Sequence, residues 1–314
     1  MNVVISFHDG DRNLAISWAN HVAKLGPYIN HKIIVVGAPR ANPEGIVDPL
    51  KRVFGTTVYI ERNRVHREGW PGSCNESFQS AFWFNQLGGI DLITGKPVKA
   101  WKEPFLWMEP DAVPLDTNWI DLVEKEYRMC GRPFMGDIVA IQGIVPNGED
   151  HMSGIAVYPS ELHTLAPRVL QTNVIDRETG RPRDYAWDIC GAEQIVPQMA
   201  RTNLIHHDWV NEKEWRRQVV TKDCVRKGAV IYHPDKNHVL INSDALGSGV
   251  QGDSATGNVG LMNHSGASPS SELKDMREMM EALKRQNEEL ISKIKGDIKP
   301  QPIVKRRGRR KKVS

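Results

Sequence analysis

Cysteine, long apolar runs and net charge are all scarce in this 314-residue sequence. The four cysteines lie far apart with no CxxC pair, which excludes a zinc ribbon and a disulfide scaffold and favours a reducing compartment. No run of about 18 apolar residues occurs, and the N-terminus lacks the basic and apolar regions of a signal peptide. We therefore expect a soluble, cytoplasmic protein with no membrane span.

The small net charge of +3 is unevenly distributed. Segment 305–312 (KRRGRRKK) carries seven basic side chains with no acid after it, so residues 1–304 carry −4. With 40% hydrophobic residues, the rest of the chain has enough apolar content for a folded domain. A mildly acidic body with a basic end is not typical of a protein that coats nucleic acid. It fits an acidic enzyme brought to a polyanion by its tail.

Short β-branched runs alternate with helical patterns in the first half of the chain, which predicts a parallel sheet covered by helices. The expected strands are Val3–Phe7, Lys32–Val36, Thr57–Ile60 and Pro104–Met108, and the expected helices are Leu14–Leu25, Cys74–Asn85 with Ser73 as N-cap, and Thr117–Met129. The second half has shorter expected strands, Phe134–Val139, Gly154–Tyr158 and Ala229–Tyr232, which indicate antiparallel additions. We expect this α/β domain to occupy residues 1–242.

The remaining chain changes composition twice. Residues 243–271 are rich in Gly, Ser, Asn and Ala and predict a flexible linker, whereas the proline-containing, basic residues 297–314 predict a disordered tail. Between them, residues 272–296 show a three-heptad pattern with Leu273 and Asn287 at a positions. An Asn at a favours a parallel homodimer through 273–294. Because the e and g positions show no charge pattern, a single amphipathic helix lying on its own domain is the alternative.

Glu109 and Asp111 lie two residues apart where an expected buried strand ends. In open α/β sheets this edge binds ligands, and side chains two apart on an extended segment can point the same way. Two converging carboxylates suit a hard divalent cation. The pair alone fits a solvated turn equally well.

Several strings in combination resemble the GT-A glycosyltransferases, particularly their bacterial and phage members. They run from about residue 3 to 241 and are ISFHDGDRNLA, WPGSCNESFQSAF, FLWMEPDAVPLDTNWIDLVEKEY, PFMGDIV, HMSGIAVYP, YAWDICGAE and VIYHPDKNHVLI. The resemblance implies a Rossmann-like mixed α/β sheet flanked by helices, a nucleotide-sugar donor such as a UDP-sugar, and a Mn²⁺ or Mg²⁺ held by a D-x-D motif.

The acidic motif of this chain is Glu-Pro-Asp, so its first carboxylate is one methylene longer than in that family, and Asp111 is the better metal ligand than Glu109. By the same resemblance, His233 is the third ligand and Lys236 reaches the donor phosphates. The alternative for His233 is a turn histidine before Pro234.

Asp188 in YAWDICGAE matches the position where inverting members of the family place the base that deprotonates the acceptor hydroxyl, and Glu193 is the nearby alternative. If the enzyme retains configuration, Asp188 would orient the acceptor or stabilise the sugar cation. The structural alternative is an acid favoured by a helix N-terminus.

The resemblance also implies donor contacts from the loop after the first strand, which holds His8, Asp9 and Asp11, and then from Arg62 and Asn75. An Asp-Gly-Asp string is also an ordinary turn.

Residues 153 and 154 in HMSGIAVYP would line the sugar or acceptor region by the same resemblance. His206, His207 and Asp208 are weaker metal candidates, because adjacent side chains usually diverge and no helical HExxH spacing is present.

In the tail, Arg307-Gly308-Arg309 resembles the centre of an AT-hook, which favours DNA binding by residues 305–312. A solubility tail, an RNA or lipid contact and a nuclear signal are the alternatives. Some phage sugar transferases modify hydroxymethylated pyrimidines, and that resemblance makes such DNA the expected acceptor. The alternatives are a glycosyltransferase acting on a saccharide or lipid-linked acceptor, and a non-catalytic DNA-binding dimer.

Overall fold

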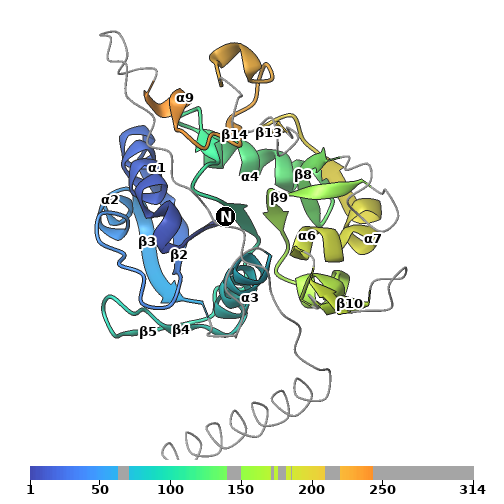
Figure 1. The fold of residues 1–314 in the computed structure, drawn as a ribbon, viewed down its shortest axis with the longest axis horizontal. Coiled ribbons are helices and arrows are strands. Elements are labelled where there is room, and N and C mark those ends of the chain that lie inside the picture. Colours follow the sequence, from blue (N-terminus) through green and yellow to red (C-terminus); the bar gives the residue numbers. More distant parts are fainter. Residues whose placement is uncertain are drawn as a thin grey trace, which may run out of the picture. The chain divides into compact units, whose positions relative to one another are not determined.

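A mixed seven-stranded sheet flanked by helices forms the core of the described part of the chain (Figure 1). The computed structural model describes residues 1–62, 71–139, 150–170, 173–175, 182–184, 186–208 and 220–242. The predicted linker 243–271, coiled-coil helix 272–296 and basic tail 297–314 lie outside the described residues. The α/β class with helices around a mixed sheet, predicted from the sequence, is confirmed.

The main sheet has the strand order β12-β8-β9-β6-β1-β2-β3. Its strands are β1 (Asn2–Phe7), β2 (Tyr28–Gly37), β3 (Phe54–Glu61), β6 (Phe105–Met108), β8 (Phe134–Val139), β9 (His151–Tyr158) and β12 (Met199–Arg201). Strand β1 runs parallel to β2 and β6, and β2 runs parallel to β3. Strand β9 is antiparallel to both of its neighbours, β6 and β8, so the antiparallel additions expected for the second half are present.

The helices are α1 (Arg12–Leu25), α2 (Val47–Lys51), α3 (Gly72–Leu87), α4 (Trp119–Cys130), α5 (Leu162–Leu165), α6 (Trp187–Cys190), α7 (Ala192–Ile195) and α9 (Val239–Asn242). Single 3₁₀ turns are η1 (Asp9–Asp11), η2 (Pro167–Leu170), η3 (Val196–Gln198) and η4 (Lys222–Cys224). Helix α1 shows why the pattern works, because its buried Ala15, Trp18, Ala19 and Val22 recur at i, i+3, i+4 and i+7.

The start of α3 differs from the prediction. The helix begins at Gly72 with Pro71 as N-cap, so Ser73 lies in the first turn and its assignment as N-cap is wrong. The carbonyl of Pro71 already accepts the backbone N–H of Asn75 at 3.0 Å. Proline suits this boundary because its fixed φ is compatible with a helix start and it has no N–H to satisfy.

Three smaller sheets complete the described chain. The one that matters for function is β13-β14-β7, built from β13 (Ile205–His207), β14 (Ile231–His233) and β7 (Val113–Pro114). Strand β14 is parallel to β13 and antiparallel to β7. The other two are the pairs β4 (Gly89–Ile90) with β5 (Pro97–Val98) and β10 (Asn173–Ile175) with β11 (Pro182–Asp184).

Strands β1 and β6 are almost entirely buried, as expected for parallel strands covered on both faces. Their side chains share one core with those of α1, α3 and α4. Among the described residues, no helix combines the length and apolar character needed to cross a membrane.

Candidate metal and catalytic site

The acidic pair follows the carboxyl end of β6, at the edge that the parallel strands β1, β2 and β3 share. A tight turn joins the two acids, because the N–H of Ala112 donates to the carbonyl of Glu109 at 2.9 Å. Helix α1 pins this turn, since the indole N–H of Trp18 donates to the Ala112 carbonyl at 2.8 Å. The Asp111 side chain is 4% exposed and that of Glu109 is 30% exposed.

A segment more than a hundred residues later is tied to this turn. Strand β14 ends at His233, and the N–H of Asp235 then donates to the Asp111 carbonyl at 2.8 Å. The Nε2 of His238 donates to the Pro110 carbonyl at 2.7 Å. These backbone contacts, together with pairing of β14 to β7, hold His233 opposite the acidic pair.

The imidazole of His233 faces both carboxylates. Its Nε2 lies 3.4 Å from Oδ1 of Asp111 and 3.6 Å from Oε2 of Glu109, and it is buried without a hydrogen-bond partner among the described residues. Two ligands about 2.1 Å from one ion are about 3.0–3.4 Å apart at octahedral or tetrahedral angles. The three side chains therefore fit a divalent cation such as Mn²⁺ or Mg²⁺, with Asp111, Glu109 and His233 as ligands.

The side chains of this group shift one another's pKa values. Burial alone would lower the pKa of His233, but Asp111 and Glu109 together raise it to about 9. Burial alone would raise the pKa of Asp111, but His233 and Lys236 hold it well below its usual range. The Nζ of Lys236 lies 2.5 Å from Oδ2 of Asp111. These contacts thus stabilise the ionised form of Asp111, which is the form that binds a cation.

One expected donor contact lies beside this group. Asp11 ends η1, after β1, and its carboxylate accepts the N–H of His8 at 2.6 Å. Burial raises the pKa of Asp11, His8 lowers it, and the charges of Asp111 and Glu109 raise it further, which places Asp11 near the acidic pair. Asp9 lies in the same turn and is exposed.

The other two expected donor contacts lie after the carboxyl end of β3 and in the first turn of α3. Arg62 follows β3 and forms an ion pair with Glu76 of α3, in which both side chains are largely buried. Asn75 is buried in the first turn of α3. Arg62 therefore braces α3 against the end of β3.

The two candidate bases lie in different surroundings. Asp188 is in the first turn of α6, largely buried, with Oδ2 3.9 Å from Nε2 of His151 on β9. Burial raises the pKa of Asp188, the charge of His151 lowers it, and the charge of Glu109 raises it. Glu193 on α7 forms an ion pair with Arg168 and is 42% exposed. The charge of Glu109 thus acts on Asp188, which places this candidate base in electrostatic contact with a metal candidate.

Two histidines near the site were not among the predicted ligands or bases, although His207 was considered as a weaker metal candidate. His207 on β13 lies with Nδ1 2.9 Å from Nδ1 of His233, and His151 lies beside Asp188. The objection raised against His206 and His207, that neighbouring side chains diverge, holds, since the His206 ring packs edge-on against Tyr232. Because adjacent side chains of a strand point to opposite faces, one of the two histidines had to face His233. The sequence could not show which one without the register of β13 with β14.

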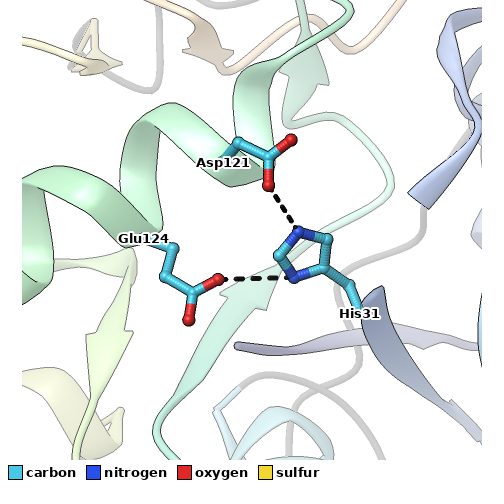
Figure 2. A group of neighbouring side chains, drawn as sticks. All are labelled: His31, Asp121 and Glu124. Atoms are coloured by element: carbon cyan, nitrogen blue, oxygen red, sulfur yellow. Dashed lines mark hydrogen bonds and ion pairs between the residues drawn. The ribbon is translucent and has the colours of Figure 1, made fainter. Parts of the chain in front are cut away.

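A second group of metal-type side chains lies elsewhere in the structure. Figure 2 shows His31 of β2 between Asp121 and Glu124 of α4. Each carboxylate faces a different ring nitrogen, with Nε2 2.9 Å from Asp121 and Nδ1 3.6 Å from Glu124. Glu124 is also 2.5 Å from Arg128. Because the two carboxylates do not converge on one nitrogen, this group ties α4 to the sheet.

No protein-family model matches the sequence, and no curated protein matches it. Among solved structures, the chain is similar to galactosyltransferase LgtC in complex with donor and acceptor sugar analogs, at a TM-score of 0.44 and 11% identity, over 74% of this chain and 87% of that one. It is also similar to mouse xyloside xylosyltransferase 1, at a TM-score of 0.42 and 11% identity, over 75% and 98% of the two chains. A third is residues 1–349 of TarS from S. aureus, at a TM-score of 0.41 and 10% identity, over 80% and 66%. The function proposed below rests on the side chains of this chain.

Proposed function

We propose that this chain is a metal-dependent glycosyltransferase that moves a sugar from a nucleotide-sugar donor, a UDP-sugar, to a hydroxyl acceptor. The observation that carries the proposal is the convergence of Glu109, Asp111 and His233 at the carboxyl edge of the sheet, with Lys236 beside them. Oxygen and imidazole ligands around one position suit a divalent cation that keeps coordination sites open for phosphate oxygens.

The leaving diphosphate needs positive charge as the bond from the sugar to its oxygen breaks. A bound Mn²⁺ or Mg²⁺ supplies this charge without transferring a proton. Lys236 is the second source of positive charge, because its ammonium group lies beside Asp111 and its side chain is half exposed. Donor hydroxyl and base groups would contact the turn that holds Asp9 and Asp11.

Asp188 serves in this proposal as the base for the acceptor. The acceptor oxygen forms a bond to the anomeric carbon, the bond from that carbon to the diphosphate oxygen breaks, and the hydroxyl proton moves to the Asp188 carboxylate. General-base assistance of this kind contributes about 10²–10⁴-fold to rate. The burial of Asp188 and the nearby His151 suit a carboxylate whose proton affinity must be tuned.

The proposed acceptor is a hydroxymethylated pyrimidine in DNA, held to the enzyme by residues 305–312. The support for this step is the sequence alone: seven basic side chains and an RGR centre in that segment. Arms that neutralise about five to seven phosphates bind DNA with a steep salt dependence. Two arms on a homodimer formed through 273–294 would add avidity.

One experiment tests donor and acceptor together. The full chain is incubated with UDP-sugars and Mn²⁺ in the presence of hydroxymethylated DNA, unmodified DNA or no DNA. Sugar on hydroxymethylated DNA alone is the expected result. Donor hydrolysis without transfer to DNA would favour a saccharide or lipid-linked molecule as the acceptor. Absence of donor consumption with every UDP-sugar would contradict the enzymatic proposal.

A further inference from the structure

His207 and His233 are direct partners in the parallel pairing of β13 with β14. Paired residues on parallel strands place their side chains on the same face of the sheet. The two imidazole rings accordingly lie side by side, with centroids 4.7 Å apart and a distance of 2.9 Å between their Nδ1 atoms. The contact leaves Nε2 of His233 facing Asp111 and Glu109.

The orientation of His233 determines which of its nitrogens needs an acceptor. When Nε2 ligates a cation, the ring proton is on Nδ1, and a buried N–H without an acceptor is costly. Nδ1 of His207 lies within hydrogen-bond distance of this nitrogen, at 2.9 Å. In that arrangement Nδ1 of His207 is the acceptor, shared between this N–H and the hydroxyl of Ser153 at 2.8 Å, so His207 carries its own proton on Nε2.

His207 is itself held by two other residues. Its backbone N–H donates to Oδ2 of the buried Asp137 at 3.2 Å, and its Nδ1 lies 2.8 Å from Oγ of Ser153. Asp137 is in turn anchored by Arg226, whose Nη2 lies 2.8 Å from the same Oδ2. Both main-chain and side-chain positions of His207 are therefore specified by the fold.

We propose that His207 is a positioning residue that fixes His233 in the tautomer presenting the Nε2 lone pair to a divalent cation. The inference rests on the proposed metal site and adds a residue to it. Partners of metal-bound histidines set ring orientation and basicity, and their loss typically costs about 10–100-fold in metal affinity. His207 contacts the ligand and not the metal position, so its effect is on affinity.

The strand also supplies a matched control. His206 pairs with Tyr232 in the same register and lies on the opposite face, where its Nδ1 accepts the backbone N–H of Arg226 at 3.1 Å. The two adjacent histidines thus share a strand and a residue type and differ in the face to which they point.

The test is a titration of the full chain with Mn²⁺, followed by the EPR signal of the free ion. Three variants are compared with the unchanged protein: His207→Leu, His207→Asn and His206→Leu. Asparagine and leucine have nearly the same shape, but asparagine keeps an oxygen near the position of Nδ1. We expect His207→Leu to weaken Mn²⁺ binding by about 10–100-fold, His207→Asn to stay within about threefold, and His206→Leu to bind normally.

Normal Mn²⁺ binding by His207→Leu, or equal losses in both leucine variants, would overturn the inference while leaving the metal site intact. If the unchanged protein binds no Mn²⁺, the metal site and the inference both fail. A second measurement does not depend on the leucine variant folding: long-range ¹H–¹⁵N spectra of the Mg²⁺-loaded protein, with the His207 signals identified by their loss in His207→Asn. The expected result is a proton on Nε2 of His207, and a proton on its Nδ1 would contradict the proposal.

Discussion

The ammonium group of Lys236 lies 2.5 Å from Oδ2 of Asp111, the carboxylate best placed to ligate a metal. The lysine therefore partners the same side chain that the cation needs. A partly exposed ion pair of this kind contributes about 1 kcal/mol or less.

This contact predicts opposite effects of Lys236→Met on metal and donor. Removing the ammonium group frees Asp111 from a cationic partner, so Mn²⁺ should bind about two- to fivefold more tightly to the free protein. The UDP-sugar should bind about tenfold more weakly, because a charged contact to its phosphates is lost. Calorimetric titrations with each ligand measure both, and Lys32→Met, which removes the lysine paired with Glu103, is the matched control. A change of both affinities in the same direction would contradict the role of Lys236 as a contact to the donor phosphates.

The two acids of the motif should contribute unequally to metal binding. Asp111 is buried and held ionised by its neighbours, whereas Glu109 is longer and 30% exposed. We expect Asp111→Asn to reduce Mn²⁺ affinity by more than about 100-fold and Glu109→Gln to reduce it by about tenfold. The difference arises because Asp111 is a well-held ligand, whereas Glu109 is held less firmly. Asp121→Asn alters a carboxylate beside His31 and should leave Mn²⁺ binding unchanged. Loss of Mn²⁺ binding in Asp121→Asn would show that the metal binds at the His31 group and not at Asp111.

The two candidate bases can be separated by mutation. Asp188→Asn should lower kcat by about 10²–10⁴-fold while Mn²⁺ and donor still bind, because a buried base is removed without touching the metal ligands. Glu193→Gln should retain nearly normal turnover, since Glu193 pairs with Arg168 at the surface. Steady-state transfer rates with a fixed donor and varied acceptor make the comparison. A large loss of turnover in Glu193→Gln with nearly normal turnover in Asp188→Asn would identify Glu193 of α7 as the base.

Local patterns were sufficient to predict the elements that bury a continuous apolar face. Residues Val3–Phe7 and Lys32–Val36 lie within β1 and β2, and Leu14–Leu25 lies within α1. The edge at which Glu109 and Asp111 emerge followed from the parallel order of these strands. The beginning of α3 was mispredicted because serine is a strong N-cap residue in general, whereas here Pro71 occupies the cap.

The small sheet that completes the site could not be predicted in the same way. Strands β7 and β13 are two and three residues long, too short for a periodic pattern. The expected strand Ala229–Tyr232 overlaps β14, but its pairing with β7, more than a hundred residues earlier in the chain, could not be predicted. Without the register of β13 with β14, the sequence does not show that His207 contacts His233 or that His206 packs against Tyr232. His233 could be predicted from the resemblance to GT-A enzymes. Its partner His207 is identified only by the observed pairing of β13 with β14.

The predicted homodimer has a direct test. The full chain should sediment as a dimer, and a chain ending at Ser271 should sediment as a monomer, because the heptads from Leu273 to Ile294 are then missing. Asn287→Leu in the full chain is a useful companion, because removing the polar a-position residue should relax the preference for two strands. An unchanged mass for the shortened chain would contradict dimerisation through 273–294.

The pair of His151 and Asp188 predicts a change in the pH dependence of transfer. The base acts in its ionised form, so activity is present above the pKa of Asp188 and is lost as the pH falls through it. Burial already raises this pKa, and the charge of His151 opposes the rise. Replacing His151 with Gln should therefore move the acidic limb of kcat/KM to higher pH, with little change in the plateau above it. His163→Gln, at a histidine on α5 beside Trp83, should leave the profile unchanged. A lower plateau with an unmoved limb would show that His151 supports the fold and does not tune Asp188.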